Sequence, residues 1–123
     1  MVCNLRNEHF DNPEFAEEIN FILETARFYN ANRDFLFHGR MLSPDGFICD
    51  SRMVDFMNRG IFTTEKTVRH GRLKLDCILH CCWQNPNGEN ALFMANYTGE
   101  EQAWEYRGLK GVLHKHSYAK IPF

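Results

Sequence analysis

Apolar and polar residues alternate through much of the second half of the chain. From Leu73 to Trp83 an apolar side chain occupies every second position, which is the period of a strand with one buried face. In this pattern Cys77 and Cys81 point toward the core, whereas His80 and Cys82 point to the opposite face. The segment therefore predicts one long strand.

Turn-forming residues divide the next part of the chain. Asn85 to Gly88 reads Asn-Pro-Asn-Gly, a sequence suited to tight-turn dihedral angles. An apolar run then covers residues 91–97, a Thr-Gly-Glu-Glu turn covers 98–101, and alternation resumes over 102–106. We expect these segments to form a β-meander with the preceding strand. Residues 109–113 and 118–121 are predicted to form a closing hairpin around a corner at 114–116.

Helical periodicity dominates the first third of the chain. Asn12, Pro13 and Glu14 are typical of a helix start, because Asn caps free amides and Pro fits the first turn. The helix is predicted to continue to about Gly39. It carries two apolar stripes. The first has steps of three and four residues and consists of Phe15, Ile19, Ile22, Ala26, Tyr29, Arg33 and Leu36. The second has steps of seven residues and consists of Phe21, Phe28 and Phe35. One small sheet would cover only part of this surface, so we expect the second stripe to be partly exposed in a monomer.

The segment between helix and meander is ambiguous. Met53, Phe56 and Met57 have helical spacing within residues 47–60, and residues 61–70 have the composition of a strand. The predicted fold class is α+β, with a long N-terminal amphipathic helix followed by a small antiparallel β-sandwich. The predicted division is a helical segment over residues 1–60 and a sandwich domain over 61–123.

Composition narrows the choice of partners. The 123 residues carry a net charge of −2, which gives no reason to expect nucleic acid or an anionic membrane as partner. No apolar run approaches the length of a membrane span. Five cysteines without framework spacing and no signal peptide favour reduced thiols in a cytoplasmic protein. Asn96-Tyr97-Thr98 matches a glycosylation acceptor but is expected to be a strand end.

Four side chains suggest a metal site. His80 and Cys82 share one strand face, His114 and His116 share another, and imidazoles and thiolates are zinc ligands. The alternative is small core thiols with surface histidines, which the lack of a Cys-x-x-Cys pair favours.

Catalytic patterns are weak. Cys82 beside His80 is the only local nucleophile–base candidate, and strand neighbours lie too stiffly side by side for a productive pair to be assumed. The carboxylates in turns or ambiguous segments are Asp45, Asp50, Asp55, Glu100 and Glu101, and none has apolar surroundings in the sequence. We find no nucleophile elbow and no phosphate-binding loop.

Two indoles could bind carbohydrate. Trp83 and Trp104 lie on predicted strands, where an exposed ring could stack on a sugar. Aromatic residues in strands are more often packing residues, so core packing is the favoured alternative.

Several segments together resemble a known family. The aromatic helix ending Asp34-Phe-Leu-Phe-His-Gly-Arg-Met-Leu42, the run Ala91-Leu-Phe-Met-Ala-Asn-Tyr-Thr98 with its acidic turn, and His116-Ser-Tyr-Ala-Lys-Ile121 resemble the C-terminal region of large bacterial glycoside hydrolases. In that family a (β/α)8 catalytic barrel precedes a small antiparallel sandwich. The resemblance covers about residues 13–42 and 71–123.

The resemblance implies an accessory role. The family's catalytic carboxylates lie on the barrel, so no catalytic residue is assigned here, and enzymatic activity of this chain alone stays open. The helix would pack on the barrel of the parent protein. The rival hypotheses are a stand-alone carbohydrate-binding module using Trp83 or Trp104, a small metal-stabilised domain, and a dimer in which the helix stripes of two copies cover each other.

Overall fold

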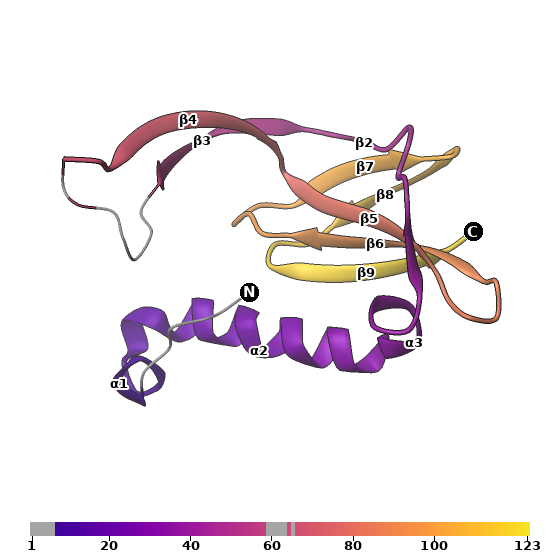
Figure 1. Ribbon diagram of the computed structural model, residues 1–123, viewed down its shortest axis with the longest axis horizontal. Coiled ribbons are helices and arrows are strands. Elements are labelled where there is room, and N and C mark those ends of the chain that lie inside the picture. The colour runs from indigo at the N-terminus through magenta and orange to yellow at the C-terminus, as the bar shows by residue number, and fades with distance from the viewer. Residues whose placement is uncertain (1–6, 59–63, 65) are drawn as a thin grey trace.

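The computed structural model describes residues 7–58, 64 and 66–123 and has an α+β fold (Figure 1). Its helical elements are α1 (Asn7–Phe10), the 3-10 turn η1 (Pro13–Phe15), α2 (Ala16–Ala31) and α3 (Arg33–Leu36). Its strands are β1 (Arg40–Leu42), β2 (Ile48–Cys49), β3 (Ser51–Asn58), β4 (Arg69–Asp76), β5 (Ile78–Gln84), β6 (Asn90–Asn96), β7 (Gln102–Tyr106), β8 (Leu109–Leu113) and β9 (Ser117–Pro122).

The strands form three antiparallel sheets. Their orders are β1-β5-β6-β9, β2-β7-β8 and β3-β4. Figure 1 shows α2 beneath the four-stranded sheet, the three-stranded sheet above it, and the β3–β4 pair extending to one side. We call the β3–β4 pair the arm. The predicted division after residue 60 falls between β3 and β4, which are hydrogen-bonded to each other.

The four-stranded sheet is covered on both faces. Between the two larger sheets lies a cluster of buried side chains: Ile78, Cys82, Leu92, Met94, Tyr106 and Leu113. On the helix side, Phe35, Ala91 and Phe93 form a second cluster. Two covered faces explain why residues 91–94 of β6 are all buried, since no position in this run faces water.

The helix is shorter than predicted. It begins where expected, with the Glu14 N–H donating to Asn12 Oδ1 at 3.0 Å. The 19 residues of η1 and α2 then end at Ala31, and α3 follows after Asn32. The side chain of Asn32 donates to the Phe28 carbonyl at 2.9 Å, and such local bonding of Asn competes with helix continuation.

The predicted long strand is interrupted at Cys77. The Cys77 N–H donates to the carbonyl of Asp50 at 2.8 Å, and Asp50 lies between β2 and β3. Both strands of the arm therefore leave the main sheets at the same place. The interruption also changes which side chains face the core: Cys82 is fully buried between the two sheets, so the expectation that it points away from the core is wrong.

The predicted meander and closing hairpin are also wrong in their pairing. The β5–β6 hairpin is confirmed, from Ile78↔Asn96 to Gln84↔Asn90. β7 instead pairs with β2 and β8, and β9 pairs with β6 rather than with β8. The ambiguous segment 47–60 contains strands β2 and β3 instead of a short helix. Four residues of the predicted strand at 61–70 (61–63 and 65) lie outside the described residues. Of the others, Arg69 and His70 begin β4, whereas residues 66–67 form a turn.

Candidate functional site

Of the two apolar stripes on the helical segment, one packs on the sheet and the other is largely exposed. The stripe formed by Phe21, Phe28 and Phe35 packs on the four-stranded sheet. The Phe28 ring meets the Phe93 ring edge-on with centroids 6.0 Å apart, and the Phe35 ring lies 5.6 Å from the Phe93 ring. Phe35 is only 6% exposed, and Phe21 and Phe28 are partly buried. The expectation that this stripe is partly exposed is therefore confirmed for Phe21 and Phe28 and wrong for Phe35, which the sheet buries.

Polar residues complete this sheet-facing stripe. Thr25 and Asn32 lie between the three phenylalanines at helical spacing. The Thr25 hydroxyl donates to the Phe21 carbonyl at 2.7 Å, and it also contacts the Tyr118 hydroxyl. Because these two residues are polar, the hydropathy pattern showed only the repeat of seven. With them included, steps of four and three run through Phe21, Thr25, Phe28, Asn32 and Phe35.

The other apolar stripe faces outward for much of its length. Of its predicted residues, Phe15 in η1 and Tyr29 are each 39% exposed, and Ala26 is also exposed. Leu23, which was not part of the predicted stripe, is 41% exposed. We call Phe15, Ile22, Leu23, Ala26 and Tyr29 the outer stripe. Ile19, which belongs to the same predicted stripe, is buried. A helix with a covered apolar face and a second exposed one has a surface suited to another protein.

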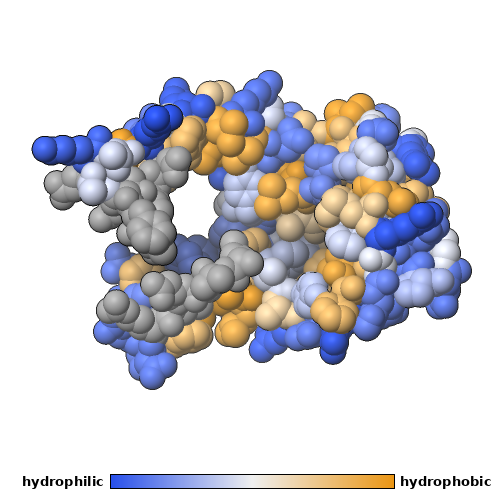
Figure 2. All heavy atoms as spheres, viewed as in Figure 1, coloured by the Kyte–Doolittle hydropathy of each residue, from blue (hydrophilic) through white to orange (hydrophobic). Residues whose placement is uncertain are grey.

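The arm is a second exposed apolar element. Residues paired across the strands share a face, so Val54, Phe56, Leu73 and Leu75 lie together with Arg52. Figure 2 shows hydrophobic residues gathered along the arm, and an open space between it and the rest of the molecule. The Arg52 guanidinium lies 4.9 Å from the centre of the Tyr97 ring, which holds the base of the arm against the body.

The four candidate metal ligands do not come together. Cys82 Sγ contacts the Tyr106 hydroxyl at 3.3 Å in the core, whereas His114 Nδ1 lies 2.5 Å from Glu101 Oε1 on the surface. His116 Nδ1 is 3.9 Å from Glu17 Oε1. Within the described residues, no three His, Cys, Asp or Glu side chains are grouped so as to hold a metal ion.

The proposed nucleophile–base pair has other partners. His80 stacks on Phe47 with ring centroids 4.0 Å apart, and its Nδ1 lies 3.1 Å from the Ile78 carbonyl. Cys82 is fully buried beside Tyr106. Burial also raises the pKa of the neighbouring Cys81 thiol, which disfavours the reactive thiolate at neutral pH. The four described cysteines are all free thiols.

The two tryptophans are half-buried in different layers. Trp83 packs beside the helix-side cluster and donates from Nε1 to Cys81 Sγ at 3.2 Å. Trp104 packs against the cluster between the sheets, with its ring over Gly111. Carbohydrate binding by either indole stays a prediction.

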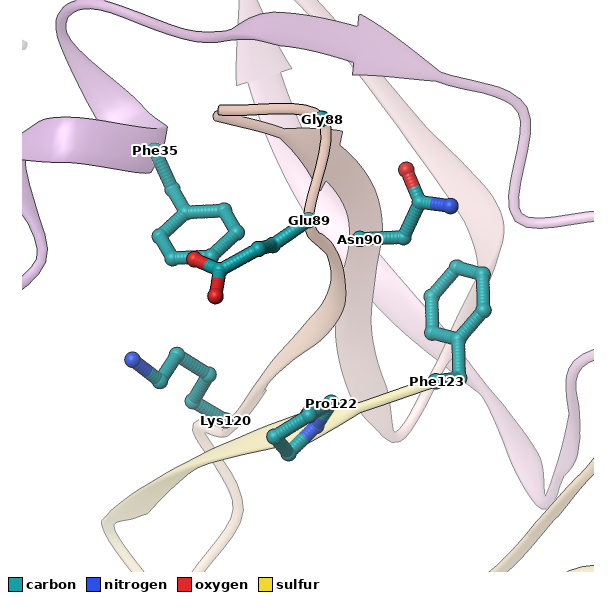
Figure 3. Close-up of a pocket in the computed structure, with 7 residues that line it drawn as sticks. All are labelled: Phe35, Gly88, Glu89, Asn90, Lys120, Pro122 and Phe123. Atoms are coloured by element: carbon teal, nitrogen blue, oxygen red, sulfur yellow. The ribbon is translucent and has the colours of Figure 1, made fainter. Parts of the chain in front are cut away.

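One hollow lies at the β5–β6 turn. It has a volume of about 570 Å³ and is lined by Phe35, Gly88, Glu89, Asn90, Lys120, Pro122 and Phe123. Figure 3 shows the Glu89 carboxylate beside the Phe35 ring. Asn85 donates to this carboxylate at 2.6 Å, and the Lys120 ammonium lies 5.0 Å from the centre of the Phe35 ring. Glu89 is the one carboxylate among these lining residues, whereas most glycoside hydrolases use two.

A more polar hollow lies where the arm joins the body. It has a volume of about 500 Å³ and is lined by Asp50, Ser51, Arg52, Cys77, Thr98, Gly99, Glu100 and Gln102. Asp50 and Glu100 are both exposed, so the apolar surroundings that would tune a catalytic acid are missing there.

The Asn96-Tyr97-Thr98 motif lies at the end of strand β6, as expected, and its asparagine is part of the core. Asn96 is fully buried, and its Nδ2 lies within hydrogen-bonding distance of three carbonyl oxygens, those of Glu100, Leu113 and His114, at 2.7, 3.0 and 3.0 Å. Its Oδ1 accepts from the backbone N–H and the hydroxyl of Thr98. Asn96 therefore forms hydrogen bonds with both the β6–β7 and the β8–β9 connections, where the chain passes between the two larger sheets.

Comparison with protein-family models, curated proteins and solved structures found no match to this chain. In the part of the chain that the structure describes, no helix has both the length and the apolar character needed to cross a lipid bilayer.

Proposed function

We propose that this chain is a non-catalytic accessory domain of a glycoside hydrolase, and that the outer stripe of α2 packs against a (β/α)8 catalytic domain. The two larger sheets, packed around Tyr106 and Leu113, would be the small β-sandwich of that region. The segments of residues 13–42 and 71–123 that resemble the family support this proposal.

The observation that carries the proposal is that α2 has apolar side chains both on the face covered by the sheet and on exposed parts of its surface. Phe21 and Phe28 of α2, with Phe35 of α3, already cover the chain's own sheet, yet Leu23 and Tyr29 remain about two fifths exposed on other sides of α2. Burying the remaining two fifths of each such side chain would contribute roughly 0.6–1.2 kcal/mol, in proportion to the apolar area removed from water. A helix that needed only its own sheet would carry polar residues at these positions.

The test is binding in trans. The coding region that precedes this chain in its genome is sequenced, and a (β/α)8 domain found there is produced as a separate protein and titrated with this chain by calorimetry. We expect a saturable complex that the double variant Leu23→Glu/Tyr29→Glu abolishes. The matched control is Val112→Glu, because Val112 is 57% exposed on β8 in the three-stranded sheet.

Three results would contradict the proposal. They are a preceding region without a barrel, a folded barrel that does not bind this chain, and equal loss of binding in the Val112→Glu control. Calorimetry with oligosaccharides tests the rival hypothesis: heat that Trp83→Ala or Trp104→Ala removes would favour a carbohydrate-binding module instead.

A further inference from the structure

The arm lacks a covering layer within the described residues. β3 and β4 pair with each other over eight positions, from Ser51↔Asp76 to Asn58↔Arg69, and with no other described strand. Figure 1 shows the arm extending beyond the other sheets. A two-stranded ribbon is only marginally stable in water, so pairing at one of its outer edges would stabilise it.

The two edges of the arm differ in charge. β4 contains Arg69, Arg72 and Lys74, and basic residues of this kind discourage further strand pairing. β3 reads Ser-Arg-Met-Val-Asp-Phe-Met-Asn, with one cation, one anion, no Lys and no Pro. The edge of β3 is therefore the one that remains open to another strand.

One face of the arm is apolar and exposed. Phe56 and Leu73 are 45% and 49% exposed and lie on the same face as Val54 and Leu75. Hydrophobic residues gather along the arm in Figure 2. An unprotected strand edge next to an exposed apolar face is a site where another chain adds a strand.

We propose that β3 pairs antiparallel with β3 of a second copy, about a two-fold axis at Val54, so that the two arms form one four-stranded sheet. With a two-fold axis perpendicular to the joined sheet, the apolar faces of both copies lie on the same side of that sheet. The residue at the axis then lies opposite the same residue of the second copy. With Val54 at the centre, the two valines meet. Arg52 then lies opposite Phe56 on the apolar face, and Met53 lies opposite Asp55 on the other.

One of the two neighbouring registers is unfavourable. A centre at Asp55 places two carboxylates directly opposite each other, which destabilises a strand pair. The Val54 register instead places Arg52, whose guanidinium also lies over the Tyr97 ring of its own chain, opposite Phe56 of the second copy on both sides of the axis. This complementarity of β3 with itself identifies a second copy of this chain as the partner. The interface uses a different surface from the outer stripe of α2, so this inference goes beyond the function proposed above.

The first experiment compares two matched variants. Val54 and Leu73 are cross-strand partners on the same face, so Val54→Lys and Leu73→Lys perturb the arm alike. Only Val54→Lys places two lysines opposite each other at the axis. By sedimentation velocity over a concentration series, we expect a wild-type dimer, a dissociation constant raised about fivefold by Val54→Lys, and little change with Leu73→Lys. Circular dichroism checks that both variants fold.

The second experiment uses disulfide trapping. Residues opposite each other in neighbouring strands have Cβ atoms about 4.5–5.5 Å apart, so Val54→Cys should form a covalent dimer under mild oxidation. Leu73→Cys serves as the control, because its two copies would lie three strand spacings apart, about 14 Å. Wild-type protein gives the background from the native thiols.

Four outcomes would overturn the proposal. They are a wild-type chain that stays monomeric over the whole concentration series, equal weakening by Val54→Lys and Leu73→Lys, equal trapping of the two cysteine variants, and a dimer that Leu23→Glu rather than Val54→Lys dissociates. A folded monomer that pairs β3 with an added peptide would assign the edge to a different partner and would also overturn it.

Discussion

Tyr118 donates a hydrogen bond from its hydroxyl to the backbone carbonyl of Phe21 at 3.1 Å, and the two rings stack with centroids 5.3 Å apart. These residues are 97 positions apart in the sequence. The contact joins the last strand to the first long helix. Tyr118 also stacks on Phe28 at 5.2 Å, so this one side chain contacts two of the three aromatic residues on the sheet-facing stripe.

Removal of the Tyr118 hydroxyl tests the hydrogen bond separately from the ring contacts. Tyr118→Phe keeps both stacking contacts but loses the bond to Phe21 and the contact with Thr25. We expect the free energy of unfolding in urea to fall by about 1 kcal/mol. Tyr29→Phe, on the exposed side of α2, is the matched control and should have little effect. Equal losses in both variants would contradict this assignment.

Alkaline pH should weaken the fold through two tyrosines. Burial is the main cause that raises the pKa of Tyr118, and burial followed by the hydrogen bond with Cys82 raises the pKa of Tyr106. The folded state therefore holds these protons more tightly than the unfolded state, whose tyrosines have a pKa of about 10. Their stabilising contribution is complete below that pH and is lost as the pH rises through the folded pKa values.

The measurement is urea unfolding at a series of pH values, with tyrosinate absorbance recorded on the folded protein. We expect the free energy of unfolding to fall above a pH of about 10. Tyr118→Phe should show a smaller fall, because only the contribution of Tyr106 remains of the two. A fall of the same size in wild type and variant would show that Tyr118 is not one of the groups responsible.

Asn96 should be among the least replaceable residues of the chain. Asn96→Asp replaces the Nδ2 group, which faces three carbonyl oxygens, with an oxygen that repels them. Several buried groups then lose their partners, so we expect a loss of at least about 3 kcal/mol in the free energy of unfolding. Asn87→Asp in the exposed β5–β6 turn provides the matched control. A small effect at Asn96 would mean that the two connections do not depend on its amide.

The close approach of the Trp104 indole requires a glycine at position 111. A Cβ atom at this position would lie 2.9 Å from Cζ2 of Trp104, so Gly111→Ala must displace the ring. We expect a loss of about 1–3 kcal/mol and a changed tryptophan fluorescence spectrum. At Gly99 an added Cβ meets no atom within 4 Å, so Gly99→Ala is the control and should be tolerated. Unchanged fluorescence in Gly111→Ala would contradict the contact.

Short-range features of the fold could be read from the sequence. The helix start at Asn12 and the β5–β6 hairpin were both predicted, because a side-chain cap and a tight turn depend on a few neighbouring residues. The bounds of β7 and β8 also agree with the prediction. None of these features requires knowledge of what packs against the segment.

The candidate surfaces were harder to predict. Alternation from Leu73 to Trp83 suggested one strand with one buried face, but the hydrogen bond from Cys77 to Asp50 interrupts it. Beyond that point α2 covers one face of the sheet and β7–β8 the other. The arm was not predicted either, since helical spacing of Met53, Phe56 and Met57 competed with strand pairing that only the partner strand reveals.

The sequence by itself determined an amphipathic helix, a set of short antiparallel strands and more apolar surface on the helix than one sheet could cover. Only the tertiary structure decided which stripe of α2 contacts the sheet, which strands pair, and where Asn96 and Tyr118 find their partners. The physical reason is the separation along the chain over which each interaction acts. Caps, turns and hydrophobic period act between neighbours in sequence, whereas burial and strand pairing depend on groups that the fold brings together from distant positions.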